Sequence, residues 1–111
     1  MGNRIESAME VSKEEFNRIV SNGHKLVVVD FFADWCMPCL MMAPVIEELA
    51  KNMKDIKFVK IDVDENSELS EKYEIRSIPT LIFFKNGKMI DRVVGGMDDY
   101  ALEKKIESLL D

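Results

Sequence analysis

Two stretches of the chain are too apolar along their whole length to face water on either side. They are KLVVVDFFA (residues 25–33) and IKFVKIDVD (residues 56–64), and both are rich in β-branched and aromatic residues. Strands that are apolar on both faces are typical of the centre of a parallel sheet covered by helices on each side. The sequence therefore predicts an α/β fold, with helices in the segments between the strands.

The segments around these two strands have helical spacing. Ser12 and Glu15 form a capping box ahead of an amphipathic run, which ends at SNG (residues 21–23). Helical apolar periodicity also predicts helices at residues 36–52 and 97–111. A short, polar helix is expected at residues 65–75.

The C-terminal third also contains a hairpin. In TLIFFKNGKMIDRVVGG (residues 80–96), two apolar runs are joined at an Asn-Gly turn. IESAM (residues 5–9) is expected to be an edge strand. The order β-α-β-α-β-α-β-β-α predicts a central mixed sheet, mostly parallel with a C-terminal antiparallel hairpin, flanked by helices on both faces. A length of 111 residues fits one domain, residues 1–111.

Charge and hydropathy exclude several functional classes. The formal net charge is -6, the pI is about 4.8, and no Lys/Arg cluster is present. We therefore expect neither nucleic acid nor a membrane as a partner. No stretch approaches the roughly 20 apolar residues of a membrane span, and MGNRIESAME lacks the apolar core of a signal peptide. We expect a cytoplasmic protein, where a permanent disulfide is unexpected.

The two cysteines of the chain, Cys36 and Cys39, lie at a strand-to-helix junction. The unpaired N–H groups at a helix start favour a negative charge, so they lower the pKa of a thiol placed there. Pro38 is tolerated in the first helical turn. We predict that Cys36 is the exposed nucleophile and that Cys39, one turn deeper, is the resolving thiol.

Three other interpretations of the pair remain open. A structural disulfide would close a very small loop, which stabilises little. A zinc site needs four ligands, whereas the chain has two cysteines and one histidine, His24. In the third interpretation, both thiols are buried and inert. A C-x-x-C motif near a βαβ pattern favours redox chemistry over all three.

Two charged residues interrupt the apolar strands. Burial of Asp30 should raise the pKa of its carboxyl group and allow it to exchange protons near neutral pH. Lys60 either pairs with this charge or extends to solvent. Pro79, in RSIPT, precedes a strand, and from the sequence alone an ordinary trans bond would be expected.

The segments VVVDFFADWCMPC, RSIPTLIFFKNGK and VVGG occur in the order and at the spacing found in thioredoxins, and the resemblance extends from Val11 to the end of the chain. This resemblance implies the thioredoxin fold and a protein-disulfide reductase whose Cys36 and Cys39 cycle between dithiol and disulfide. Asp30 resembles the buried acid that assists proton transfer to and from Cys39, and Lys60 resembles its partner.

The resemblance also implies a substrate-binding surface. Pro79 matches a cis-proline packed beside the cysteines, and Ile78 would offer backbone hydrogen bonds to an extended substrate segment. The sequence departs from the family at Met37, which is usually glycine, and at Phe32, which is frequently tryptophan. The apolar docking surface would consist of Trp35, Met37, Pro38, Val94, Gly95 and Gly96.

The activity implied is that of an electron-carrying thiol-disulfide oxidoreductase acting in electron transport and cell redox homeostasis. We expect no cofactor and no metal. The expected partners are disulfide-containing proteins and a thioredoxin reductase of the NADPH-flavin or the ferredoxin type, with the chain as a monomer. An oxidase or isomerase, suggested by Met37, and a non-catalytic protein-binding module remain as alternatives.

Overall fold

The computed structural model describes residues 8–110. Within this range the elements follow the predicted order, β-α-β-α-β-α-β-β-α. Only the end of the expected strand at residues 5–9 lies among the described residues. The elements are β1 Met9–Glu10, α1 Lys13–Ser21, β2 Val27–Phe32, α2 Met37–Asn52, β3 Lys57–Asp62, α3 Ser67–Lys72, β4 Thr80–Lys85, β5 Lys88–Val94 and α4 Asp99–Leu109.

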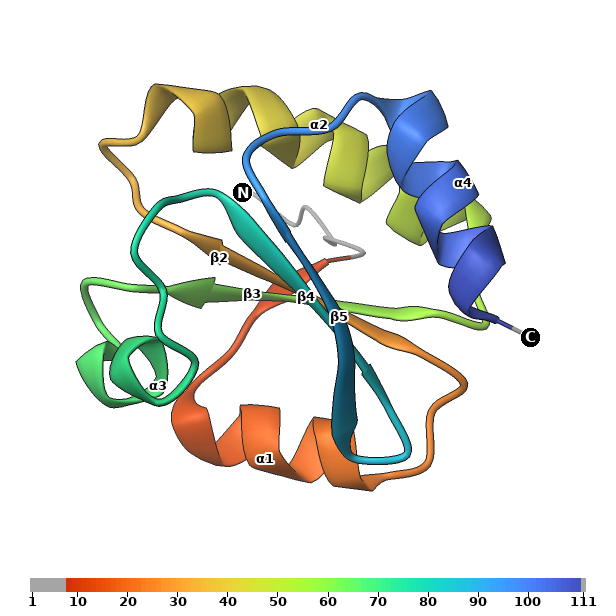
Figure 1. Cartoon of the computed structure of the whole chain (residues 1–111), viewed down its shortest axis with the longest axis horizontal. Coiled ribbons are helices and arrows are strands. Elements are labelled where there is room, and N and C mark those ends of the chain that lie inside the picture. The colour runs from red at the N-terminus through yellow and green to blue at the C-terminus, as the bar shows by residue number, and fades with distance from the viewer. Residues whose placement is uncertain (1–7, 111) are drawn as a thin grey trace, which may run out of the picture.

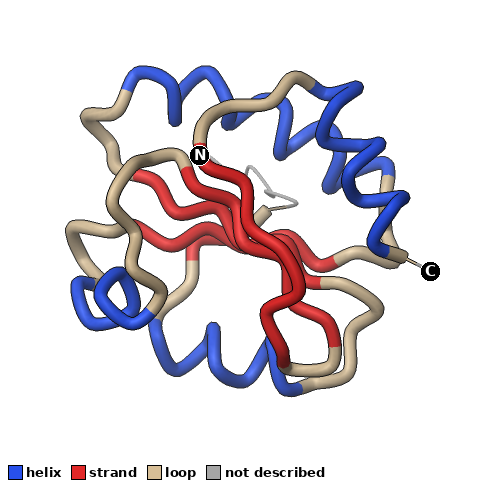
Figure 2. The backbone as a smooth tube through the Cα atoms, in the orientation of Figure 1, coloured by secondary structure: helices blue, strands red, loops and turns tan. Residues whose placement is uncertain are grey.

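The strands form one mixed sheet in the order β1-β3-β2-β4-β5. β3 pairs in parallel with β1 and with β2, whereas β4 runs antiparallel to both β2 and β5. Helices α2 and α4 cover one face of the sheet and α1 and α3 the other (Figure 1). The tube view in Figure 2 shows the loops gathered at the ends of the strands. This is the α/β architecture that the sequence predicted.

Each face of the sheet has its own apolar core. Val28 and Phe58 pack with Met42 and Ile46 on the side of α2 and α4. On the other side, the rings of Phe16, Phe84 and Tyr73 form edge-to-face contacts. β2 is buried along its entire length because it lies in the middle of the sheet between the two cores.

Local sequence signals account for several element ends. The capping box is present: Ser12 Oγ accepts a hydrogen bond from Glu15 N, and Glu15 Oε1 accepts one from Ser12 N. In the β4–β5 turn, Asn86 and Gly87 both have positive φ, of 55° and 80°, as a tight hairpin requires. None of the helices in residues 8–110 is long and apolar enough to cross a membrane.

The register of the sheet brings three distant segments to one end of the molecule. Phe31, near the end of β2, pairs with Thr80 at the start of β4, and Thr80 pairs with Val94 at the end of β5. The loop from β2 to α2 therefore meets the loop before β4 and the loop after β5. The cysteine pair lies in the first of these loops and the first turn of α2.

Candidate active site

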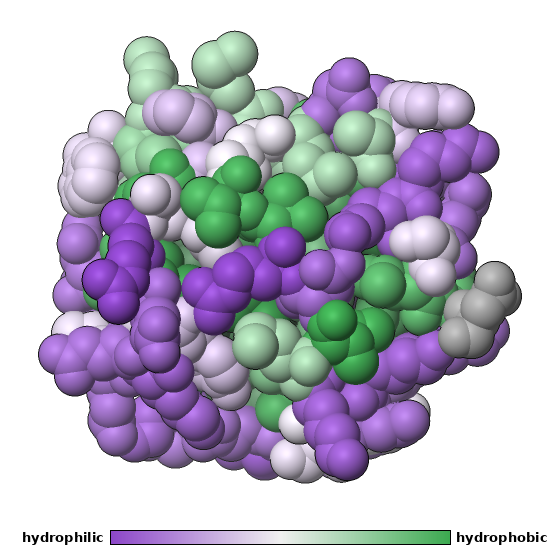
Figure 3. All heavy atoms as spheres, in the orientation of Figure 1, coloured by the Kyte–Doolittle hydropathy of each residue, from purple (hydrophilic) through white to green (hydrophobic). Residues whose placement is uncertain are grey.

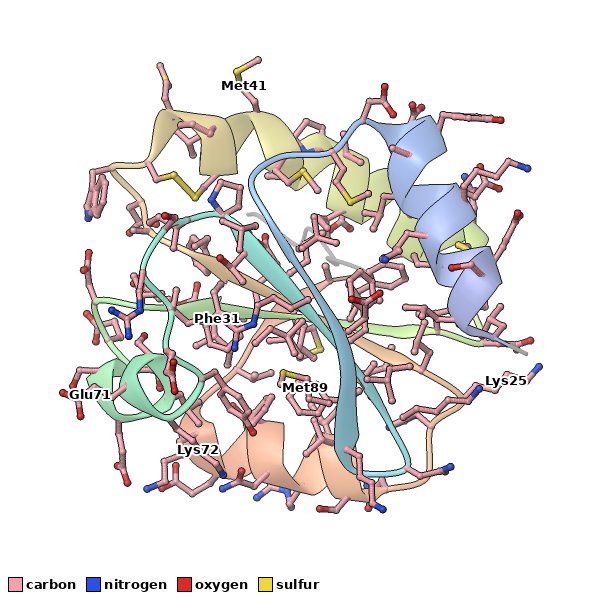
Figure 4. All side chains as sticks on the ribbon, in the orientation of Figure 1. Lys25, Phe31, Met41, Glu71, Lys72 and Met89 are labelled. Carbon is pink, nitrogen blue, oxygen red and sulfur yellow. A yellow bond between two sulfur atoms is a disulfide. The ribbon has the colours of Figure 1, made fainter. Side chains whose placement is uncertain are left out.

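The cysteine pair is built around the start of α2. Cys36 is the N-cap residue, and its Sγ accepts a hydrogen bond from the backbone N–H of Cys39 at 3.2 Å. The two residues form a disulfide with Cα atoms 5.2 Å apart, visible as a sulfur–sulfur bond at the start of α2 in Figure 4. Pro38 lies in the first turn, as predicted. Both thiols therefore lie within the N-cap and first turn of α2.

Burial does not distinguish the two cysteines as expected. Cys36 is 4% exposed and Cys39 is 3% exposed, so the predicted exposed Cys36 is covered in this disulfide form. Phe32 and Ala33 pack around both residues, and Ile78 lies against the same cluster. What distinguishes the two thiols is their place on the helix, since only Cys36 is the capping residue.

A cis peptide bond joins Ile78 and Pro79, as the resemblance implied. The carbonyl oxygen of Ile78 lies 3.8 Å from Cys36 Sγ, so this loop borders the disulfide directly. The backbone N–H of Gly95 donates to the carbonyl oxygen of Pro79 at 2.8 Å. This bond ties the loop after β5 to the loop before β4, next to the cysteines.

An apolar surface surrounds the disulfide. Trp35, Met37 and Val94 are 70%, 67% and 59% exposed, which is high for such side chains. Figure 3 shows hydrophobic side chains projecting from the edge of the molecule where α2 lies, and Met41 points outward there in Figure 4. The predicted docking residues come from the loop before α2 and its first turn, and from the end of β5 and the loop after it.

One contact of this surface was missed by the sequence analysis. The indole Nε1 of Trp35 donates to Asp64 Oδ2 at 2.8 Å, which orients an otherwise exposed ring. Asp64 N in turn donates to Oδ1 of Asp62, a buried carboxylate at the end of β3. The sequence shows the two acids in IDVD, but no local pattern relates Asp64 to a tryptophan 29 positions earlier.

Asp30 is buried, as predicted. It is 1% exposed, and its Oδ1 has no hydrogen-bond partner among the described residues. Burial raises the pKa of Asp30 from 3.8 to about 7, and the positive charge of Lys60 opposes part of that rise. Asp30 lies between Val28, which packs against α2, and Phe32, which packs against the cysteines. Its alternation in β2 therefore directs the carboxyl group towards α2.

Lys60 is the residue opposite Asp30 on the neighbouring strand. Of the two possibilities left open, an ion pair is not formed: no carboxylate among residues 8–110 pairs with the Lys60 ammonium. Instead its Nζ lies 4.7 Å from the centroid of the Phe32 ring. The Lys60 ammonium therefore contacts the Phe32 ring, and its charge lowers the pKa of Asp30 without a direct contact. Within the described residues, no group of His, Cys, Asp and Glu is arranged to hold a metal ion.

Comparisons with known proteins agree with this geometry. The family model described as Thioredoxin matches residues 7–108. Thioredoxin-2 of Saccharomyces cerevisiae is 54% identical over 97 residues, which are 87% of this chain and 92% of the relative. The thioredoxin of Mycoplasmoides gallisepticum is 52% identical over 96 residues, which are 86% of this chain and 95% of the relative.

Solved structures agree as well. A thioredoxin from Nicotiana alata superimposes with a TM-score of 0.88 at 36% identity, covering 100% of this chain and 99% of the other. A mutant thioredoxin from Halobacterium salinarum gives a TM-score of 0.86 at 39% identity, covering 99% and 97%. With a cysteine pair that closes a disulfide at a helix start, the chain belongs to the thioredoxin family of thiol-disulfide oxidoreductases.

Proposed function

We propose that the protein is a general protein-disulfide reductase in which Cys36 attacks the substrate and Cys39 resolves the intermediate. The observation that carries this assignment is the position of Cys36 at the N-cap of α2, where its sulfur accepts the N–H of Cys39. A thiolate formed there is stabilised by that donor and by the positive end of the helix.

The reaction then has two exchange steps. The Cys36 thiolate attacks one sulfur of a substrate disulfide, which forms a mixed disulfide and releases the other substrate sulfur as a thiolate. The Cys39 thiolate attacks Cys36 Sγ, which releases the second substrate thiolate and forms the Cys36–Cys39 disulfide. Two electrons thus pass from the cysteine pair to the substrate, and a reductase must return them.

Asp30 is proposed as the acceptor of the Cys39 proton. Its carboxyl group faces α2, and its pKa of about 7 lets it gain or lose a proton at neutral pH. In the disulfide form the acid has no thiol proton to accept. In the mixed disulfide with substrate, the ionised carboxylate of Asp30 can take up the proton that Cys39 must lose before it attacks Cys36 Sγ.

The substrate is proposed to be an extended polypeptide segment. The peptide groups around Ile78 lie beside the disulfide, and Trp35, Met37 and Val94 present exposed apolar side chains around it. Such an arrangement supports binding through backbone hydrogen bonds with little selection for side chains. The disulfide-containing partners of the family are consistent with this breadth.

The cellular setting is part of the same proposal. We place the protein in the cytoplasm, as one domain and a monomer that carries electrons in redox homeostasis. A cysteine pair that opens and closes in each reaction cycle is compatible with this setting, where a permanent disulfide is unexpected. Assays with an NADPH-flavin reductase and with a ferredoxin-linked reductase will decide which one serves it.

Reduction of insulin disulfides, with dithiothreitol as electron donor, tests the function. The wild-type protein should accelerate insulin precipitation, and Cys36→Ser should not. If the wild-type protein accelerates precipitation no more than Cys36→Ser does, the thiols are incidental and the chain acts as a binding module. A reduction potential of the pair that favours oxidation of dithiols would instead support an oxidase or isomerase.

A further inference from the structure

Lys60 lies between a buried acid and an open cleft. By register it is opposite Asp30 on β2 and Glu10 on β1. The cleft has a volume of about 380 Å³ and is lined by residues of α2, by Lys60 of β3 and by Ala8, the residue before β1. Besides Lys60, it is lined by Glu47, Glu48 and Lys51 of α2, and Glu48 and Lys51 are exposed. Lys60 therefore borders both the buried Asp30 and the open cleft.

The Lys60 ammonium contacts the ring of Phe32. The distance of 4.7 Å from Nζ to the ring centroid is within the range of a cation–π interaction. Phe32 is 7% exposed and packs with Ala33 and both cysteines, so its ring has little freedom to move. Lys60, by contrast, carries a flexible four-carbon stem.

We propose that Phe32 is a positioning residue for thiol-disulfide exchange, whose ring keeps the Lys60 ammonium beside Asp30 and out of the open cleft. A lysine ammonium is strongly hydrated, and the open cleft gives access to water and to the exposed carboxylate of Glu48. Without the ring, the cleft becomes the favoured place for the charge. This role rests on the proposed proton transfer between Cys39 and Asp30, because it acts on the acid that receives the proton.

Other charged groups face this pair from the surrounding elements, and they do not replace Lys60. Glu10 on β1 and Asp62 on β3 are acids, and β4 places the apolar Leu81 opposite Asp30. On α2, Cys39 forms the disulfide in the oxidised protein and carries no charge. Lys60 is the positive charge that lowers the pKa of Asp30. Its withdrawal should therefore raise that pKa, and the nearby acids cannot compensate.

The test is a carbon-13 NMR titration of the Asp30 carboxyl group in the oxidised protein, in which the cysteines do not titrate. Phe32→Leu removes the ring and should move the midpoint of Asp30 to higher pH, by no more than Lys60→Met does. Phe32→Tyr keeps an aromatic ring, so the Asp30 titration midpoint should stay at the wild-type value. In a Lys60→Met background, Phe32→Leu should cause no further shift.

Kinetics supply a second measurement. The rate at which Cys39 resolves the mixed disulfide should rise with pH as Asp30 ionises. The pH profile of this rate should therefore move to higher pH in Phe32→Leu and stay unchanged in Phe32→Tyr. At pH values well above the midpoint the two variants should resolve it equally fast. If Phe32→Leu does not fold, Phe32→Met serves the same comparison, because it fills the site without a ring.

Three results would overturn the proposal. They are an unchanged Asp30 midpoint in Phe32→Leu, a shift to lower pH, and a shift of the same size in the Lys60→Met background. The last would mean that the ring acts by excluding water from Asp30 and not through the ammonium. Failure of the proposed function is distinguishable, because Asp30→Asn would then resolve mixed disulfides at the wild-type rate whatever the titrations show.

Discussion

Asp30 lies directly opposite Lys60 on the neighbouring strand, yet the two side chains form no ion pair. The ammonium contacts the ring of Phe32, and Oδ1 of Asp30 has no partner among the described residues. A carboxylate in contact with a lysine would have a lowered pKa, but burial without contact raises the pKa of Asp30 to about 7. The missing contact therefore keeps the acid able to exchange protons at neutral pH.

Stability should depend on pH through Asp30. Its pKa in the folded protein is above the unfolded value of 3.8, so the bound proton stabilises the fold fully below pH 3.8. That stabilisation is lost as the pH rises to about 7, where a buried charge must form. Asp30→Asn should thus gain stability relative to wild type over this interval, on the order of a few kcal/mol above pH 7. Urea denaturation from pH 5 to 9 measures it, and a difference independent of pH would contradict the prediction.

The same substitution should slow the second exchange step. Loss of a positioned proton acceptor typically costs about 10²-fold or more in rate. In Asp30→Asn, resolution of a preformed mixed disulfide at pH 7 should fall by roughly that factor. The initial attack by Cys36 should change much less. Stopped-flow measurement of each step separates them, and equal slowing of both would point to a general distortion of the site.

The roles of the two thiols can be read from trapped intermediates. Cys39→Ser should accumulate a stable mixed disulfide through Cys36, because the resolving thiol is absent. Cys36→Ser should form no such adduct on the same timescale. Intact-protein mass spectrometry after exposure to a disulfide substrate detects both. Faster adduct formation on Cys39 than on Cys36 would reverse the assignment.

The hydrogen bond from Trp35 to Asp64 should matter for binding more than for stability. The ring is 70% exposed, so Asp64→Ala should reduce the free energy of unfolding by no more than about 1 kcal/mol. A freed indole should present a less ordered surface and raise KM for a protein substrate while kcat changes little. Asp55→Ala, which removes another exposed acid far from the cysteines, is the matched control. An equal rise of KM in both variants would attribute the effect to net charge.

Local patterns in the sequence were sufficient for the elements and for much of the site. The apolar strands, the capping box of Ser12 and Glu15 and the turn at Asn86 and Gly87 depend on interactions between residues close in sequence. The burial of Asp30 followed from its apolar neighbours along the strand. The pKa shift followed from that burial.

Contacts between distant segments were decided only by the tertiary structure. The sequence by itself determined that Cys36 starts a helix and that Asp30 and Lys60 lie within strands. It did not show that both cysteines would be covered, that Trp35 would donate to Asp64, or that the Lys60 ammonium would contact Phe32 in place of Asp30. Each of these depends on strand register and loop packing, which bring together residues that no local periodicity relates.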